Sequence, residues 1–389
     1  MNKLGVYLHL PFCRARCAYC DFYSTTDRTV FDMRRYVYAL ERHIEYMTEN
    51  MEDSEADTVY FGGGTPSVIG VTALDSLLST VNLRFGLSKD AEITLEANPA
   101  EICDNFMEKS ANPEKTLLLL RNSGFNRISF GVQSSNDDEL SILGRRHTFA
   151  DAQKAVKDAR NAGFDNLSLD LMYALPNQTM DSWKRSVNDI IDLNPEHISC
   201  YALRIEDNTP ICLRRREQPD DEVQLEQYLY MCETLKNAGY EQYEVSNFAK
   251  PGKRSRHNSK YWVHDDYLGF GAGAHSFMSG VRFAYGRDMD KYTEKVMSGK
   301  LDPDELNELE YKDFLEEFIM LSLRTCDGLD ETIMRLRLQC DLFPAYDFIE
   351  KCVKNGLCKW DGSVLKLTPT GFFVSNAIIV ELLCLLDKE

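Results

Sequence analysis

Short apolar runs alternate with longer amphipathic stretches through the first half of the chain, and this pattern predicts alternating strands and helices. The stretches at 29–47 and 149–163 have helical spacing, and Gly163 suits the end of the second helix. The apolar runs, rich in Val, Ile, Leu, Phe and Tyr, lie at 5–10, 57–63, 91–97, 126–132, 165–173 and 197–204. We therefore predict βαβ units on a parallel sheet, and six such units suit a partial, open barrel.

Polar residues and glycines gather where the predicted strands end. Ligands of parallel α/β sheets bind at the C-terminal ends of the strands. Those ends carry, in chain order, His9 with the cysteines after it, GGGTPS at 62–67, Glu96 with Asn98, Gln133 with Ser134, Asp170 and Tyr201. We expect the binding site at this end of the sheet.

The alternation breaks after residue 205. A helical stretch at 222–240 precedes a glycine- and aromatic-rich segment at 257–276, and a small hairpin at 359–367 interrupts the helical pattern of the last eighty or so residues. We predict a core at 1–205, an extension of it at 206–300, and a mainly helical, winged-helix-like accessory domain at 301–389.

The charge and hydropathy of the chain argue against a nucleic-acid partner and against a transmembrane helix. The 389 residues include 44 basic and 62 acidic ones, so the net charge of −18 repels nucleic acid, and we expect no such partner. No apolar run approaches the roughly 18 residues that a transmembrane helix needs. The first residues lack the pattern of a signal peptide, so we expect the protein in the cytoplasm.

Twelve cysteines in a cytoplasmic chain favour metal binding or buried thiols over disulfides. Nine of them, from Cys103 to Cys384, are scattered, and we interpret these as small buried side chains. The other three, Cys13, Cys17 and Cys20, have the spacing C-x3-C-x2-C.

Three clustered thiolates point to a metal centre, because thiolates are the ligands that iron–sulfur clusters and zinc select. A closed centre needs four ligands. The sequence therefore leaves two alternatives: a cluster with one iron open to a ligand, or zinc completed by a remote ligand such as His9.

The glycine run GGGTPS follows the second predicted strand. It lacks the lysine of a P-loop and the spacing of a dinucleotide fingerprint. Glycines let a backbone approach a ligand closely, although a tight turn explains the run equally well when it is considered alone.

The cysteine spacing, placed after the first strand of a βα repeat, resembles the signature of the radical S-adenosylmethionine (SAM) superfamily, in which SAM chelates the fourth iron of a [4Fe–4S] cluster. More closely, the chain resembles the family related to oxygen-independent coproporphyrinogen III dehydrogenase, particularly its heme-chaperone, HemW-like branch. The motifs that carry this resemblance run in order over nearly the whole chain: YLHLPFCRARCAYCDF, YFGGGTPS, LEANP, RISFGVQS, LGRRH, LDLMYALP, HNSKYW and GFFVSNAII. The resemblance implies an α/β fold, a partial (β/α)6 TIM-like barrel of the radical SAM type with the smaller C-terminal domain.

The resemblance also implies where the cofactors bind. Cys13, Cys17 and Cys20 hold the cluster. Glu96 can face the ammonium or sulfonium charge of SAM, Arg145 can pair with its carboxylate, and Asp170 can accept bonds from the ribose hydroxyls. The full set of SAM contacts carried over by motif is Tyr7, Tyr19, Gly63, Gly64, Thr65, Glu96, Gln133, Arg145, Asp170 and Ala202.

Two features separate the branches of the family. Phe22 stands where the dehydrogenases have a further cysteine, and HNSKYW resembles a motif associated with heme binding. Five cations and no acid lie between Val245 and His264, and such cations can pair with heme propionates. The resulting heme candidates are His257, Asn258, Tyr261, Trp262 and His275, and the axial ligand stays open among His257, His264 and His275.

We therefore expect a heme chaperone that binds a [4Fe–4S] cluster, SAM and heme, and passes heme to an apo-hemoprotein. An electron donor for the cluster and a homodimer follow from the same resemblance. The alternatives are an oxygen-independent coproporphyrinogen III oxidase, which Phe22 disfavours, and a zinc-stabilised binding protein.

Overall fold

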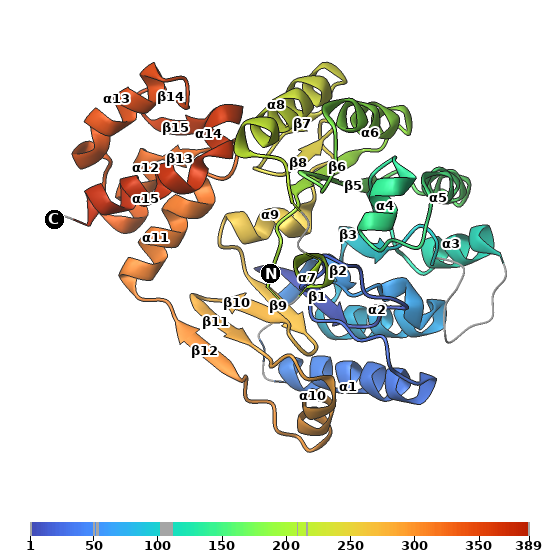
Figure 1. The fold of residues 1–389 in the computed structure, drawn as a ribbon. Coiled ribbons are helices and arrows are strands. Elements are labelled where there is room, and N and C mark those ends of the chain that lie inside the picture. The colour runs from blue at the N-terminus through green and yellow to red at the C-terminus, as the bar shows by residue number, and fades with distance from the viewer. Residues whose placement is uncertain are drawn as a thin grey trace.

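The structure, a computed structural model, describes residues 2–49, 51, 54–101, 112–207, 209–214 and 217–387 of the chain. Figure 1 shows a large α/β unit, coloured from blue through yellow to light orange, beside a smaller unit of darker orange and red elements that carries the C-terminus. Within the described ranges, no helix combines the length and apolar character that crossing a membrane requires.

Six parallel strands form the centre of the large unit, and each falls on a predicted run. They pair in chain order, and β1 and β6 do not pair with each other, so the sheet stays open. The prediction of βαβ units on an open parallel sheet is confirmed. The strands are β1 (Asn2–Leu10), β2 (Ser54–Gly63), β3 (Leu87–Ala97), β4 (Arg127–Gln133), β5 (Leu167–Tyr173) and β6 (His197–Ala202).

Helices connect these strands, two more follow β6, and most of them cover the outer face of the sheet (Figure 1). Thr29 starts the first of them with a capping box that it forms with Asp32, and one helical face is buried from Met33 to Ile44. The helices are α1 (Val30–Thr48), α2 (Val71–Phe85), α3 (Pro113–Asn122), α4 (Asp137–Ile142), α5 (Phe149–Asn161), α6 (Met180–Asp192), α7 (Pro210–Leu213) and α8 (Asp221–Asn237), with a 3-10 turn, η1, at Pro66–Ile69.

The segment after β6 extends both edges of the sheet. On one edge β9 (Tyr267–Phe270) runs parallel to β1, and β10 (His275–Met278), β11 (Val281–Ala284) and β12 (Glu305–Glu308) continue it antiparallel. On the other edge β8 (Asn247–Ala249) pairs with β6, and β7 (Glu241–Gln242) pairs with β8. Two further helices belong to this region: α9 (Arg256–Trp262) and α10 (Met289–Met297). The boundaries at residues 205 and 300 stay a prediction.

The smaller unit packs helices around a three-stranded antiparallel sheet, and the predicted hairpin forms its β14 and β15. Backbone bonds from Val245 to Arg324 (3.0 Å) and from Cys326 to Tyr243 (2.9 Å) join it to the barrel. Its elements are α11 (Tyr311–Ser322), β13 (Leu329–Asp330), α12 (Glu331–Leu338), η2 (Phe343–Ala345), α13 (Tyr346–Lys354), β14 (Cys358–Trp360), β15 (Val364–Leu367), α14 (Pro369–Phe373) and α15 (Ser375–Leu386).

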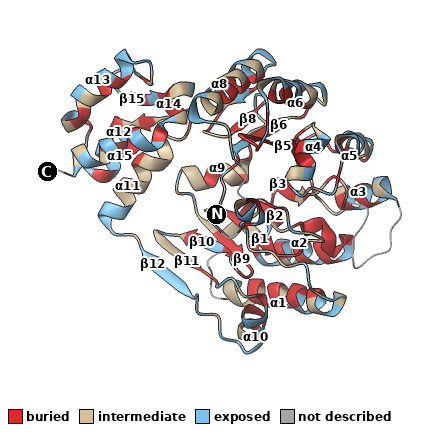
Figure 2. Cartoon of the chain, viewed as in Figure 1, coloured by how far each residue is buried: buried red, intermediate tan, exposed pale blue. Residues whose placement is uncertain are grey.

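Alternation along the central strands separates an apolar face from a polar one. On β2, Val59 and Phe61 are fully buried in the apolar core, whereas Thr58 and Tyr60 face the interior of the barrel. Figure 2 shows the central strands as largely buried. The interior is polar because other strands contribute Glu92, Thr94, Arg127, Ser129, Ser168, His197 and Ser199, all of them buried.

The scattered cysteines behave in different ways. Cys200, Cys232, Cys352 and Cys358 are buried, as the sequence interpretation expects, but Cys384 is exposed. Cys103 lies outside the described residues. Each cysteine within the described ranges is a free thiol.

Candidate functional site

The three clustered cysteines lie in the loop that follows β1, at the C-terminal end of the parallel sheet. Other segments fix this loop by backbone hydrogen bonds. Cys13 donates to the carbonyl of Thr25 (3.0 Å), and Ala18 donates to that of Leu143 (2.9 Å). Ile211 of α7 donates in turn to Ala18 (2.9 Å). The cysteine loop is thus held between the segment after α4 and helix α7.

The glycine run after β2 packs directly against the start of the cysteine loop. Gly64 donates its amide to Leu10 (2.9 Å), and Thr65 donates to Phe12 (2.7 Å). A Cβ atom on Gly64 would stand 2.7 Å from the carbonyl oxygen of Phe12, closer than van der Waals contact allows. Glycine is therefore required here for two backbones to touch, and the reading of GGGTPS as a simple tight turn is insufficient.

The three thiols are partly accessible, and one of them lies beside the glycine run. All three are half-buried, and Sγ of Cys13 lies 3.6 Å from Oγ1 of Thr65. Burial raises the pKa of Cys13 to about 11, so a bound metal or a cation is needed to hold its thiolate. No set of three or more His, Cys, Asp and Glu side chains in the described part of the chain converges on one metal ion. An iron–sulfur cube takes each thiolate on a different iron, so it requires no such convergence.

Arg145, in the segment after α4, reaches the cysteine loop. Its Nη1 donates to Sγ of Cys17 at 3.3 Å, and its Nη2 donates to the carbonyl of Gly131. Nε of Arg145 is buried and has no hydrogen-bond partner among the described residues, so the guanidinium keeps one donor for a ligand.

Two carboxylates lie inside the barrel on the strands that flank β4: Glu96 on β3 and Asp170 on β5. Tyr60 donates to Oε1 of Glu96 (2.7 Å), and burial raises the pKa of Glu96 to about 7. Ser129 donates to Asp170 (3.2 Å), whose pKa is also raised, by burial. Both groups lie at the end of the sheet that carries the cysteines.

The remaining predicted SAM contacts surround the same region. Tyr7 donates its hydroxyl to His9, and burial raises the pKa of Tyr19. Gln133 is buried with a left-handed φ of 72°, so its backbone turns sharply where β4 ends. Ala202 ends β6 and is exposed. The structure therefore brings the predicted cluster and SAM residues to one end of the barrel.

The HNSKYW segment lies at the opposite end. It forms α9, and Lys260 of this helix contacts the start of β1: a Cβ on Gly5 would stand 2.9 Å from the Lys260 side chain. His257 is only 1% exposed. Its Nδ1 is bonded to Thr58 Oγ1 (2.9 Å) and its Nε2 to Tyr261 Oη (2.8 Å). Both ring nitrogens are therefore engaged inside the chain. Asn258 and Trp262 are half-buried on the same helix.

The cations around HNSKYW have partners within the chain. Arg256 and Lys260 pair with Asp57, at 3.5 Å and 3.0 Å respectively. Arg254 pairs with Asp327 (3.3 Å). The two remaining lysines contact oxygens of Asp165, Asn194 and Glu196. These cations fasten the segment to the barrel and, through Arg254, to the smaller unit, and a propionate would have to compete for them.

The other two histidine candidates differ in accessibility. His264 bonds to Glu317 of α11 (3.0 Å) and stacks on Phe314. His275 is exposed, and within the described residues its imidazole forms no hydrogen bond or ion pair. It begins β10, directly after the turn at the end of β9, and β9 runs parallel to β1. His275 therefore lies at the same end of the sheet as the cysteines.

Sequence reasoning missed Tyr60 and Thr58. They lie two residues apart on β2 and share the face of Gly62, so strict alternation along that strand predicts that all three face the site. Arg127 was also missed; it is buried in the barrel, and its Nε has no hydrogen-bond partner within the described ranges.

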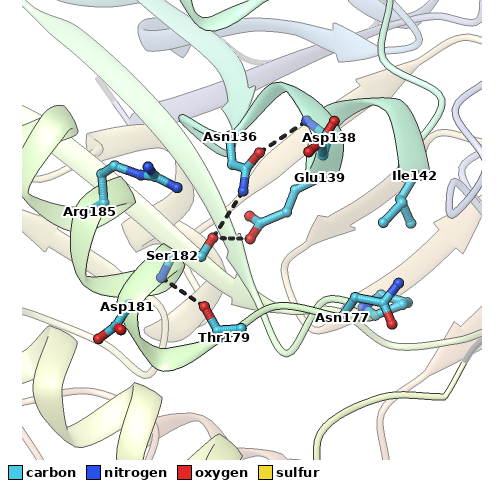
Figure 3. A pocket seen from close by; sticks show the side chains of 10 residues that line it. Asn136, Asp138, Glu139, Ile142, Asn177, Thr179, Asp181, Ser182 and Arg185 are labelled. Carbon is cyan, nitrogen blue, oxygen red and sulfur yellow. Dashed lines mark hydrogen bonds between the residues drawn. The ribbon is translucent and has the colours of Figure 1, made fainter.

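A cavity of about 460 Å³ opens between α4 and α6 (Figure 3). Glu139 is buried beside it and accepts bonds from Ser134 (2.6 Å), Gln178 (3.2 Å) and Ser182. These bonds fasten α4 to the start of α6 and so hold the segment that leads to Arg145. None of the predicted site residues lines this cavity.

Comparisons with known proteins place the sequence and the fold of this chain among radical SAM proteins. Residues 7–190 match the model of the radical SAM superfamily, and residues 309–374 match the HemN C-terminal domain. The heme chaperone HemW of Lactococcus lactis is 32% identical over 387 residues, which cover 97% of each chain. HemW of Escherichia coli is 38% identical over 276 residues, 71% of this chain and 70% of that one. The solved structure of coproporphyrinogen III oxidase (HemN) from Escherichia coli has a TM-score of 0.84 and 23% identity, and the match covers 100% of this chain and 90% of that one, which shows the fold.

Proposed function

The chain belongs to the HemW family of radical SAM proteins, and from that premise we propose that it is a heme chaperone, which binds a [4Fe–4S] cluster, SAM and heme and delivers heme to apo-hemoproteins. The observation that carries the proposal is the contact between the cysteine loop and the glycine loop. Thr65 donates to Phe12 and its hydroxyl approaches Cys13, so a cluster on the thiols lies directly beside a backbone suited to SAM.

In this proposal Cys13, Cys17 and Cys20 each supply one thiolate to the cluster. The bound cluster supplies an iron with an open position for SAM and a site for one-electron reduction. Arg145 stabilises the Cys17 thiolate through a charge-assisted bond. The half-buried loop limits the access of water to the sulfurs.

Different residues of the proposed SAM site bind different chemical groups of SAM. Glu96 faces the ammonium or sulfonium charge, and Arg145 offers its free donor to the carboxylate. Asp170 accepts from the ribose hydroxyls, and the glycine loop binds by its backbone. The complete proposed set is Tyr7, Tyr19, Gly63, Gly64, Thr65, Glu96, Gln133, Arg145, Asp170 and Ala202.

The heme candidates lie at two ends of the sheet. His257, Asn258, Tyr261 and Trp262 belong to α9, whereas His275 lies at the end that carries the cluster. We place the iron ligand at His275, because its imidazole can bind iron without losing an internal bond. Arg287 is exposed nearby and suits a propionate: a Cβ on Gly273, in the turn before His275, would stand 3.4 Å from its side chain.

The oxidase alternative is not favoured. Phe22, at the position of the further cysteine, is 71% exposed, and the relatives of nearly full length are named as heme chaperones. An electron donor and a second copy of the chain belong to the same proposal; sedimentation with and without SAM tests the dimer.

Heme transfer is the test of the proposed function. The protein is reconstituted anaerobically, loaded with hemin and mixed with an apo-globin as acceptor, and transfer is followed by the absorption spectrum of the acceptor. Parallel incubation with coproporphyrinogen III, SAM and reductant measures decarboxylation. We expect transfer without decarboxylation. Robust decarboxylation without transfer would establish the oxidase instead.

A further inference from the structure

The histidine of HNSKYW is built into the base of the barrel. Its backbone amide donates to Oε1 of Glu92 (3.1 Å), and both ring nitrogens are bonded to Thr58 and Tyr261. Burial lowers the pKa of His257 to about 3, so the ring is neutral at all ordinary pH values. A buried, neutral and doubly bonded imidazole holds its neighbours in place.

Those neighbours are two tyrosine rings. The ring of Tyr60 lies 5.2 Å from that of His257 with an interplanar angle of 26°, and the ring of Tyr7 lies 6.4 Å away at 30°. The two tyrosine rings are 6.2 Å apart. The three rings form a triangular cluster in the interior of the barrel, in which each ring contacts the other two.

Both tyrosines connect to the glycine loop at Gly63. Tyr60 reaches Gly63 through Glu96: its hydroxyl donates to Glu96 (2.7 Å), and Glu96 accepts from the amide of Gly63 (3.3 Å). Tyr7 reaches Gly63 through His9, because its hydroxyl is hydrogen-bonded to Nδ1 of His9 (3.0 Å). Nε2 of His9 lies 3.1 Å from the carbonyl of Tyr23 and must donate to it, which leaves Nδ1 to accept from Tyr7.

The ring of His9 then fills the space beside Gly63. A Cβ on this glycine would lie 2.6 Å from the His9 ring, and its φ of 109° is open to glycine alone. One side of Gly63 is therefore held by Glu96 and the other by His9. Both partners are positioned by tyrosines that rest on His257.

We propose that His257 is a positioning residue for the SAM end of the barrel, which acts through Tyr60 and Tyr7 on Glu96 and on the glycine loop. This inference rests on the proposed contact between Glu96 and SAM. It gives the HNSKYW helix a role in SAM binding, which is separate from any contact with heme.

The pH dependence of SAM binding reports on this arrangement. The pKa of Glu96 is raised to about 7, chiefly by burial, and the bond from Tyr60 lowers it. Since the ionised carboxylate attracts the SAM cation, SAM affinity should rise with pH through about 7. A loosened Tyr60 raises the pKa of Glu96 further, so the midpoint moves to higher pH. The groups that face Glu96 are Tyr7, Tyr60, Gly63, Arg127, Asp170 and Tyr261.

The test measures SAM binding to the reconstituted protein by equilibrium dialysis between pH 6 and pH 9. We expect His257→Leu to weaken SAM binding about tenfold at pH 7, which corresponds to partial loss of a hydrogen bond to a charged group, and to raise the midpoint. His257→Phe keeps a ring against Tyr60 and Tyr7 and should recover part of the loss. Tyr60→Phe should act in the same direction, and the double variant should lose less than the sum of the two.

A matched control distinguishes positioning from general loosening. His197 is equally buried, and its two ring nitrogens are bonded to Ser168 and Tyr243, both at 2.8 Å, but it does not stack on Tyr60. We expect His197→Leu to leave the midpoint unchanged. An unchanged midpoint in His257→Leu, an equal shift in His197→Leu, or additive losses in the double variant would overturn the inference.

Two outcomes concern the proposed function instead. Failure of the wild type to bind SAM, or binding by Glu96→Gln as tight as that of the wild type across the pH range, would remove Glu96 from the SAM site. Far-ultraviolet circular dichroism and iron content confirm that each variant is folded and loaded before binding is compared.

Discussion

Nη1 of Arg145 donates to Sγ of Cys17 at 3.3 Å, across 128 positions of sequence. The same guanidinium donates through Nη2 to the carbonyl of Gly131, where β4 nears its end. One planar side chain therefore joins the proposed cluster loop to the proposed SAM site, and it does so with two separate nitrogens.

Replacement of Arg145 by lysine should break this connection, because a single ammonium cannot reach both partners in the geometry of a guanidinium. We expect Arg145→Lys to weaken SAM binding at least about tenfold, as the loss of a hydrogen bond to a charged group does. Equilibrium dialysis on the reconstituted protein measures it. The control is Arg146→Lys, at an exposed neighbour whose guanidinium lies 3.9 Å from Glu101. Equal losses in the two variants would contradict this role of Arg145.

The elements that surround this contact were predictable to different degrees. The six parallel strands follow from local apolar runs, since each run must bury itself against neighbouring helices whatever the rest of the chain does. The cysteines and the glycine loop follow from spacing and from the rule that sites form at the C-terminal ends of strands. Arg145 entered the candidate site by resemblance alone, because a contact across 128 positions leaves no local pattern.

The burial of His257 and the location of His275 could not be predicted from the sequence. His257 lies in a cation-rich segment, which indicates an exposed loop, yet the structure pairs Arg256 and Lys260 with Asp57 and buries His257 beneath them. Those partners lie on β2, about 200 positions away in the chain. Conversely, His275 follows a glycine-rich turn without a distinguishing pattern, and only the parallel pairing of β9 with β1 brings it to the cluster end.

Gly64 is the position where a single methyl group should matter most for the cluster. An alanine Cβ would meet the nitrogen and oxygen of Phe12 at 2.9 Å and 2.7 Å, so Gly64→Ala must push the glycine loop away from the cysteine loop. We expect the variant to fold but to retain much less iron and sulfide after anaerobic reconstitution, measured by metal analysis and by EPR of the reduced protein.

Gly286→Ala is the control for Gly64→Ala, because its Cβ would meet only the end of the flexible Asp304 side chain, at 3.4 Å. Its iron content should equal that of the wild type. Full cluster content in Gly64→Ala would show that the two loops need not touch.

Glu244 should make stability depend on pH. It is 1% exposed, its Oε1 has no hydrogen-bond partner in the described part of the chain, and burial raises its pKa from 4.5 to about 7. Between these two values the folded state holds a proton that the unfolded state has lost, so this residue's contribution to stability falls as pH rises, and it is lost above about 7.

Glu244→Gln removes the buried charge and should therefore stabilise the protein at pH 8, by on the order of 2 kcal/mol. The gain should shrink towards pH 5, where the wild-type carboxyl is already neutral in the folded state. Denaturant unfolding at the two pH values measures the difference. The same gain at both values would mean that packing, and not ionisation, is responsible.

His275 decides where heme iron binds. As the exposed histidine at the cluster end, it offers an imidazole that iron can bind without breaking an internal bond, whereas His257 and His264 would have to give up bonds to Tyr261 or Glu317. We expect His275→Ala to lose the absorption bands of histidine-bound heme and to bind hemin about tenfold more weakly. Added imidazole should restore the bands, because a small ligand can occupy the space that the side chain leaves.

His257→Phe, titrated in parallel, should keep the wild-type heme spectrum, and cluster content should be the same in both variants. If instead His257→Phe loses the bands and His275→Ala keeps them, then α9 must open to admit heme, and the bonds that hold His257 in the barrel would have to break each time the protein is loaded.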